Sequence, residues 1–370
     1  MTRGEPPVTL SPPSVMAIDT VGTPGLWAAT IGAVVVLLVI DFFATRKPHE
    51  VSMKEAVGWS IFYVALPLAF GLFIWNQYGN ERGVEYYTGY LVEKSLSVDN
   101  LFVFMLLLAA FAVPEALKQR VLLYGIIGAL VLRGIFIALG AAALSAFDWV
   151  FLVFGAVLLV TGVKLLKDAL SGDDHEEKDV SKMRSVRLLR RFMPVSDEYD
   201  GPRVFTRING ARALTPFALV TFAVLMTDIV FAIDSVPAVY GITGDPYLVF
   251  ATNAFALLGL RALYFVLQGA LAKLVHLGFG LAAILGFIGV KLVLHWAHLV
   301  WPSVPEIPTL ASLFVIIGIL VITTITSLIA SKKAEERGQE PATPSASVAP
   351  SAPSAVDESD DDRPNSLSAR

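Results

Sequence analysis

Apolar runs of about 20 residues recur along most of this chain, and shorter polar segments separate them. A run of this length matches an α-helix that crosses the hydrocarbon core of a bilayer. We therefore expect an all-α, polytopic membrane helix bundle with about nine transmembrane helices. The pattern places these spans at about residues 26–44, 59–76, 90–113, 120–143, 146–166, 215–240, 247–268, 275–297 and 310–330.

The composition agrees with a membrane protein and narrows its chemistry. Of the 370 residues, 55% are hydrophobic and only 16% are charged, which is unusual for a soluble domain of this size. The sequence has no cysteine, so disulfides, iron–sulfur clusters and thiolate metal sites are excluded. Any metal must be bound by oxygen atoms or by the five histidines.

The two ends of the chain differ from its apolar centre. Residues 1–25 include Pro6, Pro7, Pro12 and Pro13 and lack the pattern of a signal peptide, which predicts a flexible N-terminal lead. Residues 331–370 are rich in Pro, Ser, Ala and Asp and have too little apolar surface to fold, which predicts a disordered cytoplasmic tail. Residues 26–330 form the expected transmembrane domain.

Basic residues predict the orientation in the membrane, because they concentrate on the cytoplasmic side. They follow the odd-numbered spans, and the loop 167–214 alone holds ten of them. This bias places the N-terminus outside and the C-terminus in the cytoplasm. An amphipathic stretch of the loop, near residues 183–191, lies either on the anionic inner leaflet or in solvent as a plain basic loop.

Two acidic strings interrupt the apolar spans, at residues 93–100 and 228–235. In each, a carboxylate is followed six residues later by an Asp, and that Asp by an amide or hydroxyl residue. A charge in hydrocarbon costs several kcal/mol unless it is paired or ligated. The two strings are therefore candidate functional sites.

The same alignment that superimposes Asp99 on Asp234 brings two further segments into register. Residues 133–136 match residues 261–264, and residues 162–165 match residues 289–292. The unit is three helices, in spans three to five (about 84–166) and spans six to eight (about 215–297), with the cytoplasmic loop 167–214 between them. Because three is odd, the second copy enters from the opposite face, which predicts an inverted repeat with a substrate site near its midplane.

The four acids predict an oxygen-rich cation site between the repeats, formed by Glu93, Asp99, Asp228 and Asp234 with help from Asn100 and Ser235. Six residues turn an ideal helix by about 600°, so the two acids of one string point about 120° apart. One site therefore requires either a local break in each helix or ligands divided between the helices. Pro237 favours a break beside Asp234, because proline cannot donate to the carbonyl of Ile233.

A structural reading of the acids stays open beside the functional one. They can form ion pairs with Lys94, Arg133 or Arg261. We favour Arg133 and Arg261 as buried counter-charges that return an emptied site to neutrality. Asp41, late in the first span, is expected to have a pairing or boundary role.

The strings around Glu93 and Asp234, with the segments 253–265 and 286–292, closely resemble the signature segments of the TerC family of bacterial integral membrane proteins. The resemblance covers about residues 26–330. It implies an inner-membrane protein of a wider exporter superfamily, an association with tellurium resistance and, in several members, manganese efflux. Carried onto this chain, it implies Glu93, Asp99, Asp228 and Asp234 as metal ligands, with Asn100, Ser235 and Asn253 as weaker candidates.

These observations together predict a secondary exporter of divalent cations, most simply manganese, coupled to protons. Its expected partners are the lipid bilayer, the cation and protons, with no nucleic acid and no permanently bound cofactor. We do not expect an enzyme, because the sequence has no zinc-binding helix motif and no nucleotide-binding glycine loop. Two alternatives remain: efflux of tellurite with Arg133 and Arg261 as ligands, and a non-transporting scaffold for stress-response proteins.

Overall fold

The computed structural model describes residues 20–44, 52–171, 195–208 apart from 197 and 198, 211–267 and 275–336. The predicted lead before residue 20, the tail after residue 336 and the amphipathic stretch near 183–191 lie outside these residues. The elements are α1 (Pro24–Ala44), α2 (Met53–Ala110), α3 (Glu115–Ala146), α4 (Trp149–Ser171), β1 (Phe205–Ile208), β2 (Ala211–Leu214), α6 (Pro216–Tyr240), α7 (Pro246–Leu258), α8 (Leu260–Leu267), α9 (Leu277–Val300) and α10 (Thr309–Glu336).

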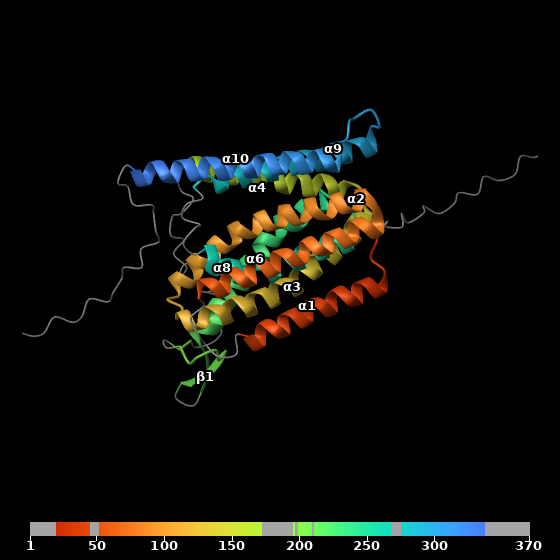
Figure 1. The fold of residues 1–370 in the computed structure, drawn as a ribbon. Coiled ribbons are helices and arrows are strands. Elements are labelled where there is room, and N and C mark those ends of the chain that lie inside the picture. The colour runs from red at the N-terminus through yellow and green to blue at the C-terminus, as the bar shows by residue number, and fades with distance from the viewer. Residues whose placement is uncertain are drawn as a thin grey trace, which may run out of the picture.

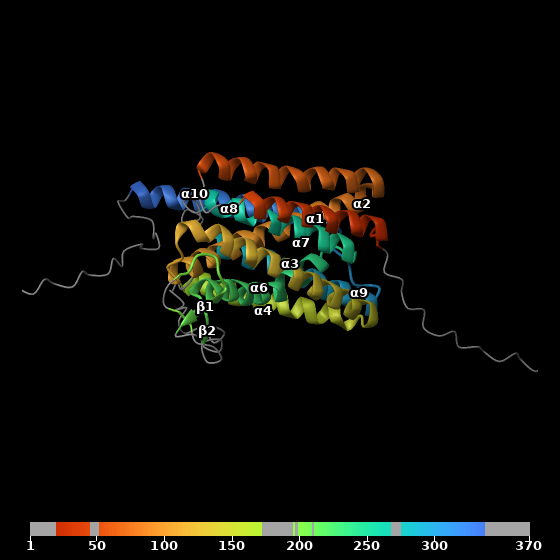
Figure 2. The same ribbon diagram turned by 90° about the horizontal axis from the view of Figure 1, so that it is seen from below.

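The helices lie side by side in an elongated bundle (Figure 1). Seven of the described helices are long and apolar enough to cross a membrane, and α7 and α8 form a further pair bent by 41°. Seen from below, α3 and α6 lie between α1 and α4 (Figure 2). The expected polytopic, all-α architecture is confirmed.

Helix α2 is a helical hairpin rather than one long rod. Its 58 residues would extend about 87 Å if straight, well beyond the roughly 30 Å of a hydrocarbon core. At Gly79 the backbone is non-helical, with φ +90° and ψ 177°, a conformation that favours glycine. The two halves then pack together, since the Tyr86 and Tyr87 hydroxyls donate to the carbonyls of Pro67 (3.1 Å) and Leu68 (2.7 Å). The predicted spans place a loop at residues 77–89. In the structure these residues are helical except at Gly79.

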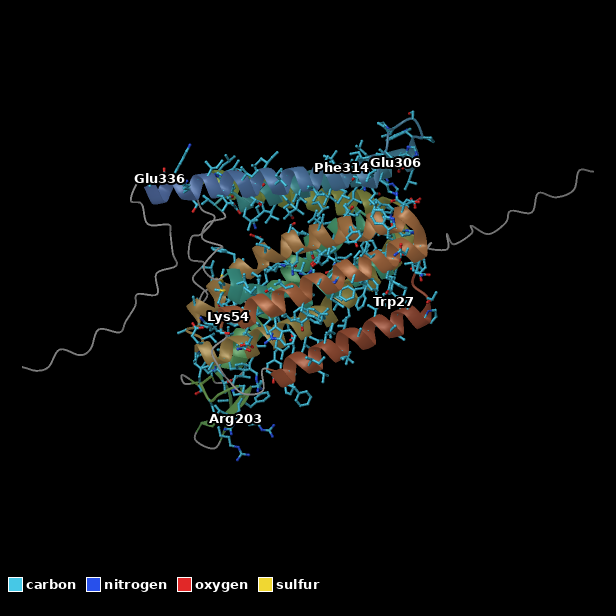
Figure 3. All side chains as sticks on the ribbon, in the orientation of Figure 1. Trp27, Lys54, Arg203, Glu306, Phe314 and Glu336 are labelled. Carbon is cyan, nitrogen blue, oxygen red and sulfur yellow. The ribbon has the colours of Figure 1, made fainter. Side chains whose placement is uncertain are left out.

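With α2 as two crossings and α7–α8 as one, the described helices cross the bundle nine times, in agreement with the predicted spans. Trp27 and Glu306 lie at one end of the bundle, and Lys54, Arg203 and Glu336 lie at the other (Figure 3). Because the number of crossings is odd, the start of the first helix, α1, and the end of the last helix, α10, lie at opposite ends of the bundle. Which end faces the cytoplasm stays a prediction.

The close packing of α4 against α9 depends on glycines. A Cβ at Gly155 would lie 2.9 Å from the carbonyl oxygen of Gly289, and a Cβ at Gly162 would lie 3.2 Å from that of Ala282. Such distances leave no room for a side chain, so the two backbones touch. Small residues permit this approach between membrane helices.

The described part of the loop 167–214 contains strands β1 and β2, which the sequence did not predict. They pair antiparallel, with Phe205 opposite Leu214. Nearby, the Tyr199 hydroxyl donates to the carbonyl of Phe111 at the end of α2 (2.7 Å). Burial raises the pKa of Tyr199 to about 12, so this contact persists across the physiological pH range.

The predicted repeat can be compared with the helix directions. The second half of α2, then α3 and α4, run opposite to α6, α7–α8 and α9 respectively (Figure 1). These are the directions that an inverted repeat requires. The repeat itself and its boundaries stay a prediction.

Candidate functional site

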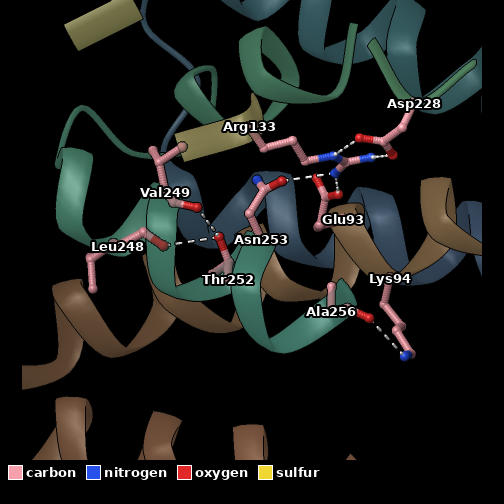
Figure 4. Close-up of polar contacts among 9 residues, drawn as sticks. All are labelled: Glu93, Lys94, Arg133, Asp228, Leu248, Val249, Thr252, Asn253 and Ala256. Carbon is pink, nitrogen blue, oxygen red and sulfur yellow. Dashed lines mark hydrogen bonds and ion pairs between the residues drawn. The ribbon is translucent and has the colours of Figure 1, made fainter. Parts of the chain in front are cut away.

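A buried arginine, Arg133 on α3, contacts side chains from three other helices (Figure 4). Its side chain is 1% exposed. Nη2 and Nε donate to the two carboxylate oxygens of Asp228 at 3.1 and 3.3 Å. Nη1 forms an ion pair with Glu93 and donates to Oδ1 of Asn253 at 2.8 Å.

Each of these four residues comes from about the middle of its crossing: Glu93 from α2, Arg133 from α3, Asp228 from α6 and Asn253 from α7–α8. The cluster therefore lies roughly halfway between the ends of the bundle. Two carboxylates and one guanidinium leave it with a formal charge of −1. Bringing such a set into an apolar bundle is costly, and pairing with Arg133 offsets that cost.

A stripe of polar residues on α2 faces the cluster. Glu93, Ser97 and Asn100 follow each other at i, i+4 and i+7, so they lie on one side of the helix. When the Asn100 amide is oriented with its oxygen toward Arg133, this oxygen accepts a hydrogen bond from Nη2 of Arg133 (3.2 Å). The amide nitrogen then donates to the carbonyl of Leu96 (3.1 Å). Ser97 thus lies between two residues that contact Arg133.

Helix α6 has the same spacing with Asp228, Ala232 and Ser235, again at i, i+4 and i+7, although its middle residue is apolar. All three side chains are at most 1% exposed. The two stripes correspond position by position in the predicted repeat. Sequence reasoning identified Asn100 and Ser235 but missed Ser97, which the four-residue spacing from Glu93 would have revealed.

Several buried polar atoms of the cluster have no hydrogen-bond partner within the described part of the chain. They are the hydroxyl oxygens of Ser97 and Ser235, together with Oε2 of Glu93 and Nδ2 of Asn253, although the side chains of Glu93 and Asn253 also interact with each other at longer range. A buried polar group without a partner costs about 1–3 kcal/mol. Native proteins tolerate few such groups, and a concentration of them points to a binding site.

The other two predicted acids, Asp99 and Asp234, form a second pair. The approach of Gly89 to Val239 and the ring contact of Phe104 with Phe231 lie on either side of them along α2 and α6. Asp234 interacts electrostatically with both Asp99 and Arg133. Both acids are only partly buried, in keeping with their rotation of about 120° from Glu93 and Asp228.

Of the two arrangements that the sequence left open, a local break in each helix is absent from the structure. Helix α2 continues through residues 93–100, and α6 continues through residues 228–235. On α2 the Ser95 hydroxyl donates to the carbonyl of Leu91 (2.7 Å), so this polar residue is satisfied within the helix. On α6, Pro237 lies only one turn before the end at Tyr240. The two helices instead divide the four acids into two pairs.

No group of three or more His, Asp or Glu residues within the described ranges is spaced to bind a metal ion. Glu93 and Asp228 form ion pairs with Arg133. Asp99 and Asp234 lie near each other, as two acids of like charge. Ligation of one cation by all four acids therefore stays a prediction, and it requires Arg133 to change partners.

The second predicted counter-charge, Arg261, lies in a different cluster. Its Nη2 is 2.8 Å from Oδ1 of Asp41, and its Nη1 donates to Gln119 (3.1 Å). The pair joins α8 to α1, which lies outside the predicted repeat. Lys94 also points away from the acids, with Nζ 3.4 Å from the carbonyl oxygen of Ala256 (Figure 4).

Comparisons with known proteins give the chain its relatives. A family model described as the integral membrane protein TerC family matches residues 78–335. An uncharacterized membrane protein of Myxococcus xanthus is 44% identical over 74% of this chain and 85% of its own length. The "Putative membrane-bound redox modulator Alx" of Escherichia coli K12 is 42% identical over 75% of this chain and 88% of its own. No solved structure matches.

Proposed function

Because the chain belongs to the TerC family, a bacterial family of multi-pass integral membrane proteins, we propose that it exports divalent metal cations across the membrane in exchange for protons. Manganese is the cation that we favour. The observation that carries the proposal is the buried cluster of Glu93, Asp228 and Asn253 around Arg133, with Asp99 and Asp234 beside it.

The ligand chemistry supports a hard cation. Every acceptor in the cluster is a carboxylate, amide or hydroxyl oxygen, which suits manganese, magnesium and calcium. The absence of cysteine removes the thiolates that select copper and zinc. Carboxylates also hold protons when no cation is bound, which gives the acids a way to couple the two.

Two other readings fit less well. A tellurite oxyanion would meet two carboxylates beside Arg133, in a cluster with a formal charge of −1, and would be repelled. The redox role in the name of the Escherichia coli relative belongs to that protein. In this chain, thiol chemistry is excluded because there is no cysteine.

The test is the metal content of cells. We expect a manganese-sensitive bacterial host to hold less manganese when it produces this protein than when it carries an empty vector. Asp99→Asn and Asp234→Asn should remove that difference, whereas Asp148→Asn, at the exposed start of α4, should preserve it. Unchanged export in both of the first two variants would sink the site assignment, and equal metal content with and without the wild-type protein would sink the function.

A further inference from the structure

Arg133 uses the acceptors that a cation would need. Its guanidinium contacts the carboxylates of Glu93 and Asp228 and the amide oxygen of Asn253, from three different helices. An arginine keeps its charge at every physiological pH, so these contacts cannot be released by deprotonation. They end when the side chain moves, and protonation of Glu93 or Asp228 weakens them.

The cluster has more oxygen atoms than Arg133 occupies. The hydroxyls of Ser97 and Ser235 have no hydrogen-bond partner among the described residues, and Oε2 of Glu93 has only a longer-range interaction with the Asn253 side chain. Together with Asp228, Asn253 and Asn100, these residues supply six oxygen-bearing side chains. Six oxygen ligands are what magnesium and manganese prefer.

A divalent cation and the guanidinium would repel each other if they shared these acceptors. Glu93 and Asp228 supply two negative charges, which one divalent cation alone neutralises. Arg133 then needs another anionic partner. Asp234, which already interacts electrostatically with Arg133 and with Asp99, is available on the neighbouring face of α6.

We propose that Arg133 is a tethered competitor of the transported cation: its guanidinium occupies the Glu93–Asp228–Asn253 acceptors between transport events, and the arriving cation displaces it toward Asp99 and Asp234. This inference rests on the proposed function. Competition inside the protein weakens apparent cation affinity, and the same competition expels the cation at the end of each cycle.

The experiment measures manganese affinity and transport separately in the full-length chain. Binding is measured by calorimetry in lipid nanodiscs with Mn²⁺, and flux is measured in liposomes. Arg133→Gln removes the competing charge and should lower the apparent Kd by about 10-fold or more, because the acceptors become available all the time. Turnover should fall, since nothing drives release.

Arg133→Lys keeps the charge but loses the planar fork that holds several acceptors at once, so its Kd should fall by less. Arg120→Gln and Arg120→Lys are the controls. Arg120 is a buried arginine on the same helix, it lies outside the cluster, and its variants should bind with the wild-type Kd. If Arg133→Gln does not fold, Arg133→Lys decides.

The outcomes separate the two proposals. If the wild-type chain neither binds nor moves Mn²⁺, the proposed function fails and this inference fails with it. If the wild-type chain does both, but the folded Arg133 variants bind no tighter than wild type, only the tethered competitor is overturned.

Discussion

The guanidinium of Arg133 donates two hydrogen bonds to the carboxylate of Asp228, from Nη2 to Oδ1 at 3.1 Å and from Nε to Oδ2 at 3.3 Å. This bidentate contact joins α3 to α6 in the middle of the bundle. Such pairs are strong and directional. Asp228 is therefore occupied by Arg133 in this conformation. A cation can bind to Asp228 only after this contact rearranges.

The Ser97 hydroxyl offers a way to separate a ligand from a structural residue. Because the Ser97 hydroxyl is buried and has no hydrogen-bond partner among the residues that the structure describes, Ser97→Ala should leave stability unchanged or raise it slightly. If the hydroxyl contributes to cation binding, the same variant should weaken Mn²⁺ binding several-fold. Thermal unfolding and calorimetry on one preparation give both values.

Ser95→Ala is the matched control, since its hydroxyl is satisfied by the carbonyl of Leu91 and points to its own helix. Its Mn²⁺ affinity should equal that of the wild type. Equal affinities for both serine variants would remove Ser97 from the site.

The buried pair of Arg261 with Asp41 should be structural. Removing one partner leaves an uncompensated buried charge, so Asp41→Asn is expected to lower the free energy of unfolding by about 3–5 kcal/mol. The double variant Asp41→Asn, Arg261→Gln should be less destabilised than the sum of the two single variants. Urea unfolding in detergent measures the coupling, and additive losses would show that the pair does not interact.

The contact of α4 with α9 should not accept a side chain. A Cβ at Gly155 meets the backbone of Gly289 at 2.9 Å, and backbone cannot move aside. Gly155→Val should therefore lower stability by about 1–3 kcal/mol or more, with a lower melting temperature. Gly286→Ala, where a Cβ meets no atom of the described part of the chain within 4 Å, should melt like the wild type.

The turn inside α2 should depend on glycine for a different reason. A Cβ at Gly79 meets no atom of the described residues within 4 Å, but its φ of +90° is strained for any other residue. Gly79→Ala should cost about 1–3 kcal/mol of stability. Gly58→Ala, in open space within the helix, should be neutral or stabilising; a Gly79→Ala protein as stable as Gly58→Ala would contradict the hairpin.

Much of the fold follows from the sequence, because nine apolar runs must cross the membrane. The tight turn at Gly79 does not follow, since the charged residues around it suggest a longer loop. The hairpin of β1 and β2 was not predicted, because the basic residues of the loop 167–214 indicate only its side of the membrane.

The site was predictable in part. The two acidic strings identify Glu93 and Asp228, whereas helix geometry left open whether each helix is broken or the acids are divided between two helices, and the structure has the division. The partner of Arg261 was not predictable, because Asp41 lies outside the repeat and only the packing of α1 brings it close. Neither helix is broken at its acidic string: on α2 the Ser95 hydroxyl is satisfied by the carbonyl of Leu91, and on α6 Pro237 lies only one turn before the end of the helix.

The most direct measurement is Mn²⁺ flux into liposomes that contain the purified chain, with a pH gradient imposed and internal Mn²⁺ and pH recorded together. We expect the wild type to move Mn²⁺ and protons in opposite directions, Asp228→Asn to lose at least about 90% of the flux, and Asp200→Asn, on the exposed loop, to retain it. A wild-type protein that moves no Mn²⁺, or an Asp228→Asn variant as active as the wild type, would contradict the account.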